Sequence, residues 1–371
     1  MPLKPVPVKG LERISPSQYN WLKRCPLRGV WSSSAVPLLP VRPKTRAGRV
    51  IHSILEAVGK GTLDPNDEEA FRDEWEARVE AEEGEMQSSW LHSRFVPLAE
   101  SVPLLEVLYH QTKHRAKELH EKKEKSKGMG EARTEEWVEA PHGGAGGFVD
   151  RVIETWEGPI LQDYKSGALS PPEREEEDAI KESYKVQMKL YAALYHEKHG
   201  RWPRSLQLVA LDDTVRTVDY TIEGARELLE EACEMLRDVN QMVSDIRENY
   251  ASHSTLADPA PEKCQACGYR PGCQAYWGAR DDSDAESWPT DVRGRVLSRE
   301  TDSGGRFVLR VSSTPGGDEI SLHAILPEMI EEGKAKDLTE GAHVGAYNLY
   351  PQSENAYKAT QHTAIYYQRR E

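Results

Sequence analysis

The chain contains 371 residues, of which 38% are hydrophobic and 30% are charged, and its formal net charge is −14 at pH 7. This length exceeds one average domain and predicts two or three folded units with buried cores. The acidic balance argues against a surface that coats nucleic acid indiscriminately. Apolar runs stay well short of the roughly 20 residues that cross a bilayer, and we find no secretory signal pattern, so we expect a cytoplasmic protein without membrane contact.

The amino-terminal segment is basic, in contrast to the chain as a whole. Residues 1–49 contain ten lysines and arginines and a single acid, Glu12. This arm is therefore a candidate for contact with phosphate groups. Ser15 and Pro16 have the residue types of a helix N-cap and a first helical position. A short helix is predicted to lead from them toward Cys25.

Two helical patterns follow. Residues 46–58 place apolar side chains on one helical stripe, with His52 and Glu56 one turn apart on another side. From about 66 to 127 the pattern stays helical and becomes highly charged. We interpret this stretch as a helical insertion at about 60–130.

The centre of the chain then changes to strand character. Strands are predicted at 134–139, 147–155 and 160–165. The residues Trp156 to Pro159 are typical of a tight turn, so the last two strands should form an antiparallel hairpin. The later predicted elements are a helix at 176–199, strands at 206–211 and 216–221, and a helix at 223–249.

The predicted hairpin carries three charged residues among apolar ones. Because residues i and i+2 of a strand face the same side, Asp163 and Lys165 must project together while Tyr164 turns to the opposite layer. The hairpin can bring Asp150 beside them, so two carboxylates and an ammonium would share one pocket. Carboxylate oxygens are the ligands that Mg²⁺ prefers. Such an ion lowers the pKa of water and neutralises charge during phosphodiester hydrolysis.

Other polar residues are candidates for the same pocket. His52, on the upstream helix, is a third potential ligand. Glu56 on the same helical face and Glu136 on the preceding strand are weaker candidates. Gln187 and Tyr191 lie one turn apart on a predicted helix, where a polar–aromatic pair commonly reflects packing alone.

Four of the five cysteines form a pattern. Cys264, Cys267 and Cys273 lie within ten residues, and Cys25 lies far upstream. In an intracellular chain these thiols should stay reduced, which favours metal or cluster binding over disulfides. Four thiolates suit either tetrahedral Zn²⁺ or a 4Fe-4S cluster, and either would pin the basic arm across the core. Cys233 is predicted to be a buried small hydrophobe.

The tail beyond the acidic linker at 281–287 is predicted to be all-β. Strands are expected at 292–299, 306–312, 319–325, 342–350 and 363–368, with a short helix at 327–336. This element order is that of an OB-fold barrel. Such barrels bind single strands by stacking bases on aromatic residues beside a basic groove. The alternatives are that the tail's aromatic residues fill its core, or that the tail docks a protein partner.

Several of these motifs together resemble a known family. Asp150 with Asp163–Lys165 resembles the signature of the PD-(D/E)XK nuclease superfamily. Gly48–His52 resembles the helix-borne histidine motif of its RecB-like branch, and Gln187–Tyr191 resembles its Gln-x-x-x-Tyr motif. The four cysteines resemble the iron–sulfur staple of members such as exonuclease V and the CRISPR-associated nucleases that process spacer precursors. The resemblance covers roughly residues 11–280.

The resemblance implies a fold, a division into domains and a cluster. The expected fold class is α/β, with a restriction-endonuclease-like mixed sheet flanked by helices and an iron–sulfur staple over residues 1–285. A small OB-like β-barrel would follow over residues 286–371. The family spacing favours a 4Fe-4S cluster over zinc. Its ligands would be Cys25, Cys264, Cys267 and Cys273.

The resemblance also implies roles for the site residues. His52, Asp150 and Asp163, with the carbonyl of Tyr164, would hold Mg²⁺ or Mn²⁺, and Lys165 would be the catalytic lysine. Gln187 and Tyr191 would brace the lysine or the DNA backbone.

The leading hypothesis is a metal-dependent DNA nuclease that acts on ends or single-stranded flaps, with exonuclease action favoured by the resemblance. Its setting would be repair, recombination or defence against foreign DNA. One alternative is a non-catalytic DNA-end-binding scaffold subunit of a helicase–nuclease or defence complex, and a weaker one is a redox protein that uses its cluster for electron transfer. Residues 59–61 are too incomplete to form an ATP phosphate-binding loop. A helicase partner would therefore have to be another polypeptide.

Overall fold

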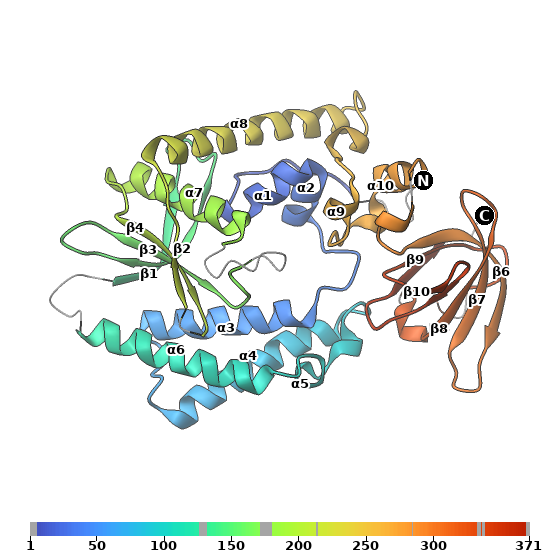
Figure 1. Ribbon diagram of the computed structural model, residues 1–371, viewed down its shortest axis with the longest axis horizontal. Helices are drawn as coiled ribbons and strands as arrows, with labels where there is room; N and C mark the ends of the chain where they lie inside the picture. Colours follow the sequence, from blue (N-terminus) through green and yellow to red (C-terminus); the bar gives the residue numbers. More distant parts are fainter. Residues whose placement is uncertain are drawn as a thin grey trace.

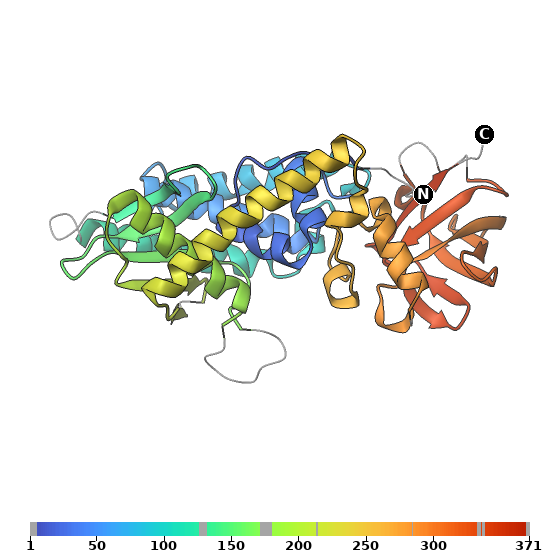
Figure 2. The same cartoon turned by 90° about the horizontal axis from the view of Figure 1, so that it is seen from above.

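The computed structural model describes residues 6–125, 132–170, 180–212, 214–283, 285–331, 335 and 338–368. They form an elongated molecule with one β-sheet near each end (Figures 1 and 2). Helices surround the first sheet, and the cysteine-bearing segment lies between the two ends (Figure 1). Among the described helices, none combines the length and apolar character needed to span a bilayer.

The first sheet contains five strands in the order β1-β2-β3-β4-β5. Their bounds are β1 (Ala132–Glu139), β2 (Gly146–Ile153), β3 (Ile160–Lys165), β4 (Ser205–Ala210) and β5 (Val215–Thr217). β2 and β3 are antiparallel, as the predicted hairpin requires, and β4 runs parallel to β3. The carboxyl ends of β3 and β4, at Lys165 and Ala210, therefore lie together at one edge. The strand predicted at 216–221 is shorter than expected, because β5 ends at Thr217.

Helices cover both faces of this sheet (Figure 1). One face holds α3 (Pro43–Lys60), α4 (Glu68–Gln87), α5 (Leu98–Ser101) and α6 (Leu105–Lys125), and the other holds α7 (Glu182–His199) and α8 (Ile222–Arg247). Tyr164 and Val209 belong to the core beneath α3, α4 and α6. Leu161 and Leu208 belong to the core beneath α7 and α8. The predicted insertion therefore supplies most of one covering layer.

Local sequence signals fix the ends of these helices. The short helix α1 (Pro16–Arg24) begins with the predicted cap: Ser15 accepts the Gln18 N–H, and the Gln18 side chain accepts the Ser15 N–H. α3 ends at Gly61, whose φ of +80° suits glycine. α2 (Pro26–Ser34) follows α1 directly, and both pack against α7 and α8 in a third core.

The carboxy-terminal sheet contains seven strands in the order β10-β11-β8-β7-β6-β9-β12. They are β6 (Val292–Thr301), β7 (Phe307–Ser313), β8 (Glu319–Ile325), β9 (His343–Tyr347), β10 (Tyr350–Ser353), β11 (Ala356–Lys358) and β12 (Ala364–Gln368). Within the described residues this order starts at β10 and ends at β12, so hydrogen bonding does not close a barrel. The predicted helix at 327–336 is wrong in its described part. Pro327–Met329 form a short 3-10 helix, Ala335 also has 3-10 geometry, and between them Ile330 makes a β-bridge to Ile365.

This sheet docks on the rest of the chain through aromatic residues. Tyr347 packs on Trp277 with ring centroids 5.9 Å apart, and Tyr366 packs on Trp90 at 5.5 Å. The Tyr366 hydroxyl donates to the Leu38 carbonyl at 2.6 Å. Since these tyrosines are buried, they favour the interpretation that the tail's aromatic residues fill a core.

Candidate active site

Asp150 lies on β2 where the pairing with β3 ends. The last paired residues on this side are Arg151 and Gln162, so Asp150 and Asp163 stand opposite each other just beyond them. One carboxylate oxygen of Asp150, Oδ2, accepts the backbone N–H of Tyr164 at 2.6 Å. This bond holds the Asp150 carboxylate against β3, where the hairpin was expected to bring it.

Asp163 and Lys165 project together from β3 toward α7. The Lys165 ammonium lies 2.6 Å from Asp163 Oδ2 and donates to Gln187 Oε1 at 2.9 Å. Gln187 donates from Nε2 to Asp163 Oδ1 at 3.0 Å, which closes a ring of three polar side chains. Asp163 is only 3% exposed. Tyr164 faces the opposite core, so the predicted alternation along β3 is confirmed.

Two tyrosines of α7 border this ring. The Lys165 ammonium lies 4.5 Å from the centroid of the Tyr184 ring, a cation–π contact. Tyr191, one turn after Gln187, is buried, and burial raises its pKa above the ordinary value. A Cβ added at Gly147 would lie 3.4 Å from a carbon of the Tyr191 ring. Gly147 therefore allows β2 to approach α7 closely.

The two aspartates share an unfavourable electrostatic environment. Burial raises the pKa of Asp150 well above its ordinary range, and the nearby negative charge of Asp163 raises it further. The Tyr164 N–H and the Lys165 ammonium act in the opposite direction, with smaller effect. Two like charges in one buried space repel each other, and a cation beside them would relieve that repulsion. Their carboxylate oxygens are hard donors that fit Mg²⁺ or Mn²⁺.

His52 stands on α3 at the rim of the same site. α3 crosses close to the end of β3, because a Cβ added at Gly48 would lie 2.9 Å from Ser166 Oγ. Burial by the surrounding protein lowers the pKa of His52, although part of its ring is exposed, and Asp163 and Lys165 act on that pKa in opposite directions. The described residues contain no group of three or more His, Cys, Asp and Glu side chains arranged around one metal ion. His52 is thus near the aspartates, but the three side chains are not arranged around a common metal position.

The two weaker acidic candidates form ion pairs with neighbouring residues. Glu136 accepts bonds from Arg133 and His199, each at 2.6 Å, and from Lys198, so it belongs to an ion-pair network of β1 and α7. Glu56 forms an ion pair with Lys60.

Glu135 is the acidic residue that the sequence reasoning missed. It stands opposite Asp150 in the register of β1 and β2, and its φ is +53°, which is unusual for a residue other than glycine. Burial and the charge of Glu56 raise its pKa, with a smaller contribution from Asp163. The sequence carried no signal for Glu135, because the register between β1 and β2 is known only from the structure.

The family comparison covers the residues of this site. Residues 13–274 match the model of the PD-(D/E)XK nuclease superfamily. The matched range is most of the chain and includes Asp150, Asp163 and Lys165. The chain belongs to the PD-(D/E)XK nuclease superfamily. Members of this superfamily are generally nucleases that hydrolyse phosphodiesters, and they typically use Mg²⁺ or Mn²⁺.

Other comparisons are more distant. A solved structure described as the crystal structure of SSO0001 is 14% identical to this PD-(D/E)XK protein, covers 47% of its chain and 80% of its own, and has a TM-score of 0.22. No curated protein matches the sequence.

A pocket of about 320 Å³ opens beside Lys165 in this PD-(D/E)XK protein. It lies at the carboxyl ends of the parallel strands β3 and β4, with Gln111 of α6 on a further side. Apolar side chains such as Leu169 and Leu211 alternate in its wall with polar ones such as Thr214 and Arg216. Ligands of α/β proteins commonly bind at this edge of a sheet.

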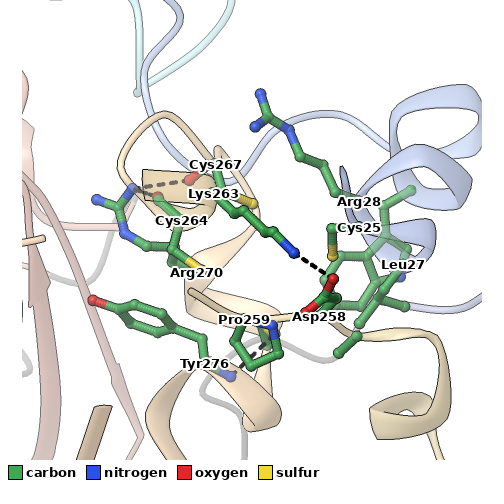
Figure 3. Close-up of a pocket in the computed structure, with 13 residues that line it drawn as sticks. Cys25, Leu27, Arg28, Asp258, Pro259, Lys263, Cys264, Cys267, Arg270 and Tyr276 are labelled. Carbon is green, nitrogen blue, oxygen red and sulfur yellow. Dashed lines mark hydrogen bonds and ion pairs between the residues drawn. The ribbon is translucent and has the colours of Figure 1, made fainter. Parts of the chain in front are cut away.

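The four predicted cysteines line a second, separate pocket. Cys25, between α1 and α2, faces the segment that carries Cys264, Cys267 and Cys273 (Figure 3). Burial raises the pKa of the Cys264 thiol to about 11 and that of the Cys273 thiol to about 12. Cys273 Sγ also accepts the Tyr276 N–H at 3.4 Å, at the start of α10 (Gln274–Asp281). All four thiols line this one pocket, and four thiolates are the donor set of a thiolate-bound metal group, but within the described residues they are not grouped closely around one ion.

Proposed function

We propose that this protein is a metal-dependent DNA nuclease that acts on single strands or DNA ends, as an exonuclease or end-processing enzyme. The observation that carries the proposal is the grouping of half-buried Asp150 and Lys165 around buried Asp163 at the end of β3, with Gln187 bridging the last two. Membership of the PD-(D/E)XK superfamily supports the reaction class.

Each residue of the grouping has a proposed role. Asp150, Asp163 and the carbonyl of Tyr164 would hold Mg²⁺ or Mn²⁺, with His52 as a further ligand from α3. The bound ion would supply Lewis-acid stabilisation of phosphate charge and a lower pKa for water.

The remaining polar groups would act through position and charge. The Lys165 ammonium lies within reach of both Asp163 and Gln187, so it can stabilise negative charge on the phosphate and orient the attacking water. Gln187 holds Lys165 and Asp163 in a fixed relation through two hydrogen bonds. Tyr191 packs beside this ring and would help to hold α7 in place against β2.

The pocket beside Lys165 supports a nucleic acid strand as the substrate. Its volume of about 320 Å³ and its mixed polar and apolar wall suit one unstacked nucleotide next to the phosphate that is cut. A single strand or a frayed end offers such nucleotides at low energetic cost.

The cysteine pocket would hold a 4Fe-4S cluster as a structural staple between Cys25 and the segment from Cys264 to Cys273. Zinc is the alternative for the same four thiolates. The staple would hold α1 and α2 against the remainder of residues 1–285, the proposed nuclease domain. Residues 286–371 would be an OB-like domain. Its proposed role is to associate with a helicase or a defence complex in the cytoplasm.

The test is cleavage of end-labelled single- and double-stranded DNA with and without Mn²⁺. Replacing Asp163 by Asn or Lys165 by Ala should lower the rate by on the order of 100-fold or more. Lys185→Ala, on the exposed face of the same helix as Gln187, is the matched control and should cleave normally.

Two results would count against the proposal. Wild-type-like cleavage by folded Lys165→Ala protein would remove the assigned site. Tight binding of DNA ends by a wild-type protein that never cleaves them would instead favour the scaffold function.

A further inference from the structure

Arg270 is a buried arginine inside the cysteine segment, between Cys267 and Cys273, and it is 2% exposed. Its Nη1 donates to three backbone carbonyls of that segment, those of Cys264 at 3.0 Å, Gln265 at 3.2 Å and Cys267 at 3.0 Å. Figure 3 shows its guanidinium beside Cys264. One nitrogen therefore binds the backbone of the segment that carries Cys264 and Cys267.

The other nitrogens of Arg270 bind the carboxy-terminal sheet. Nε donates to Asp291 Oδ2 at 2.7 Å, and Nη2 donates to Asp291 Oδ1 at 3.3 Å and to Asn348 Oδ1 at 2.5 Å. Asp291 directly precedes β6 and is fully buried. It also accepts the Tyr276 hydroxyl at 2.8 Å and the Asn348 N–H at 2.9 Å. All of these donors converge on one carboxylate.

We infer that Asp291 and Arg270 are positioning residues for the cysteine site. The carboxy-terminal sheet would then help to hold a metal site although it supplies none of the four cysteine ligands. Asp291 fixes the guanidinium, and the guanidinium fixes the loop of Cys264 and Cys267. A buried bidentate arginine–carboxylate pair gives strong directional constraint, and outer partners of this kind hold metal ligands in place. The inference rests on the proposed metal at the four cysteines and extends it to residues of the tail.

The experiment uses the full-length protein purified without oxygen. Iron, acid-labile sulfide and zinc per chain are measured with the visible absorption spectrum, and release of metal from folded protein to a chelator is timed. Asp291→Asn keeps the size of the side chain but removes its charge. We expect lower metal content and release faster by about 10-fold, the lower end of the effect of losing an outer partner. Nuclease rates are recorded on the same samples.

The matched control is Glu319→Gln, which removes a carboxylate from an exposed ion pair of the same sheet, that with Arg310. It should hold and release metal as the wild type does. Tyr276→Phe removes one donor to Asp291 without leaving a buried charge unpaired, and it should speed release to a smaller degree. This milder variant keeps the inference testable if Asp291→Asn fails to fold.

The outcomes separate the two proposals. Asp291→Asn and Tyr276→Phe proteins that melt at lower temperature, yet keep wild-type metal content and release rates, would show that the pair only joins the cysteine segment to the carboxy-terminal sheet. That result would overturn the inference. Wild-type protein free of iron, sulfide and zinc would overturn the metal proposal and the inference with it. If the wild-type protein carries metal at the cysteines but does not cleave DNA, the result counts against the proposed nuclease function and leaves the inference about Arg270 and Asp291 standing.

Discussion

The pKa of Asp150 depends on the acidic residues around it. Asp150 is half-buried, stands beside Asp163 and lies opposite Glu135 in the register of the first two strands. The negative charges of Asp163 and Glu135 both raise the pKa of Asp150. The left-handed backbone at Glu135 costs on the order of 1 kcal/mol. Such strain is commonly found at functional sites.

Exchanging Glu135 and Glu136 for Gln, one at a time, should separate function from stability. Glu135→Gln should lower the cleavage rate by about 10-fold, most strongly at low Mn²⁺, because it removes negative charge beside Asp150. Glu136→Gln should lower the melting temperature, because Glu136 is a buried acceptor for Arg133 and His199. Rates per folded molecule and thermal melts are the two measurements. Equal rates for Glu135→Gln and wild type would show that Glu135 has no part in the site.

At the scale of elements, the site depends on where helices cross the ends of strands. α7 brings Gln187 to β3, and α3 approaches Ser166 closely because Gly48 has no side chain. The segment after α4 carries His92, which is 3% exposed and whose Nε2 accepts the Val41 N–H at 3.0 Å. That segment also contacts the carboxy-terminal sheet, so His92 lies in the packing that links both ends of the molecule.

His92 should make stability depend on pH. Burial, with the charges of Arg46 and Arg94, lowers its pKa to about 4, whereas an unfolded histidine has a pKa of about 6.5. Below about pH 6.5 His92 is protonated in the unfolded chain, whereas in the folded chain it stays neutral until about pH 4. Stability should therefore fall across this window, by at most about 3 kcal/mol.

Thermal melts between pH 7.5 and pH 4 would test this dependence. His92→Gln should be less stable at neutral pH but should have a flatter pH profile. His110→Gln, which changes an exposed histidine, should keep the wild-type profile. An unchanged slope in His92→Gln would contradict the assignment.

At the scale of the whole molecule, the two ends form one packed unit. Arg94 donates three hydrogen bonds to backbone carbonyls of the carboxy-terminal sheet and its loops, those of Gln361 at 2.7 Å, Glu328 at 3.0 Å and Thr363 at 2.7 Å. Tyr347, Tyr366 and Trp277 add an apolar junction. A tail tethered only by a linker would lack these contacts.

Arg94→Ala should loosen this junction. Three backbone acceptors lose a charged donor, two of them in exposed hydrogen bonds and one in a part-buried bond, which we expect to cost about 1–3 kcal/mol in total. The melting temperature should fall, and limited proteolysis between the two sheets should become faster. Arg310→Ala, which breaks an exposed ion pair with Glu319, should have an effect below about 1 kcal/mol. Equal proteolysis of both variants would argue that Arg94 does not hold the junction.

The sequence by itself determined the features that are local to one element. Strand alternation placed Asp163 and Lys165 on one side and Tyr164 on the other, and the capping residues marked the start of α1. These follow from backbone periodicity and need no distant partner. Motif resemblance added the family, which the match over 13–274 confirms.

Tertiary structure alone decided how distant segments meet. It showed that Gln187 bonds both Asp163 and Lys165, and that Glu135 rather than Glu136 stands by Asp150. It also showed that a β-bridge at Ile330 interrupts the helix predicted at 327–336. It also paired Arg270 with Asp291. Such contacts depend on the packing of whole layers, because a side chain's partner across a core is not encoded in its neighbours along the chain.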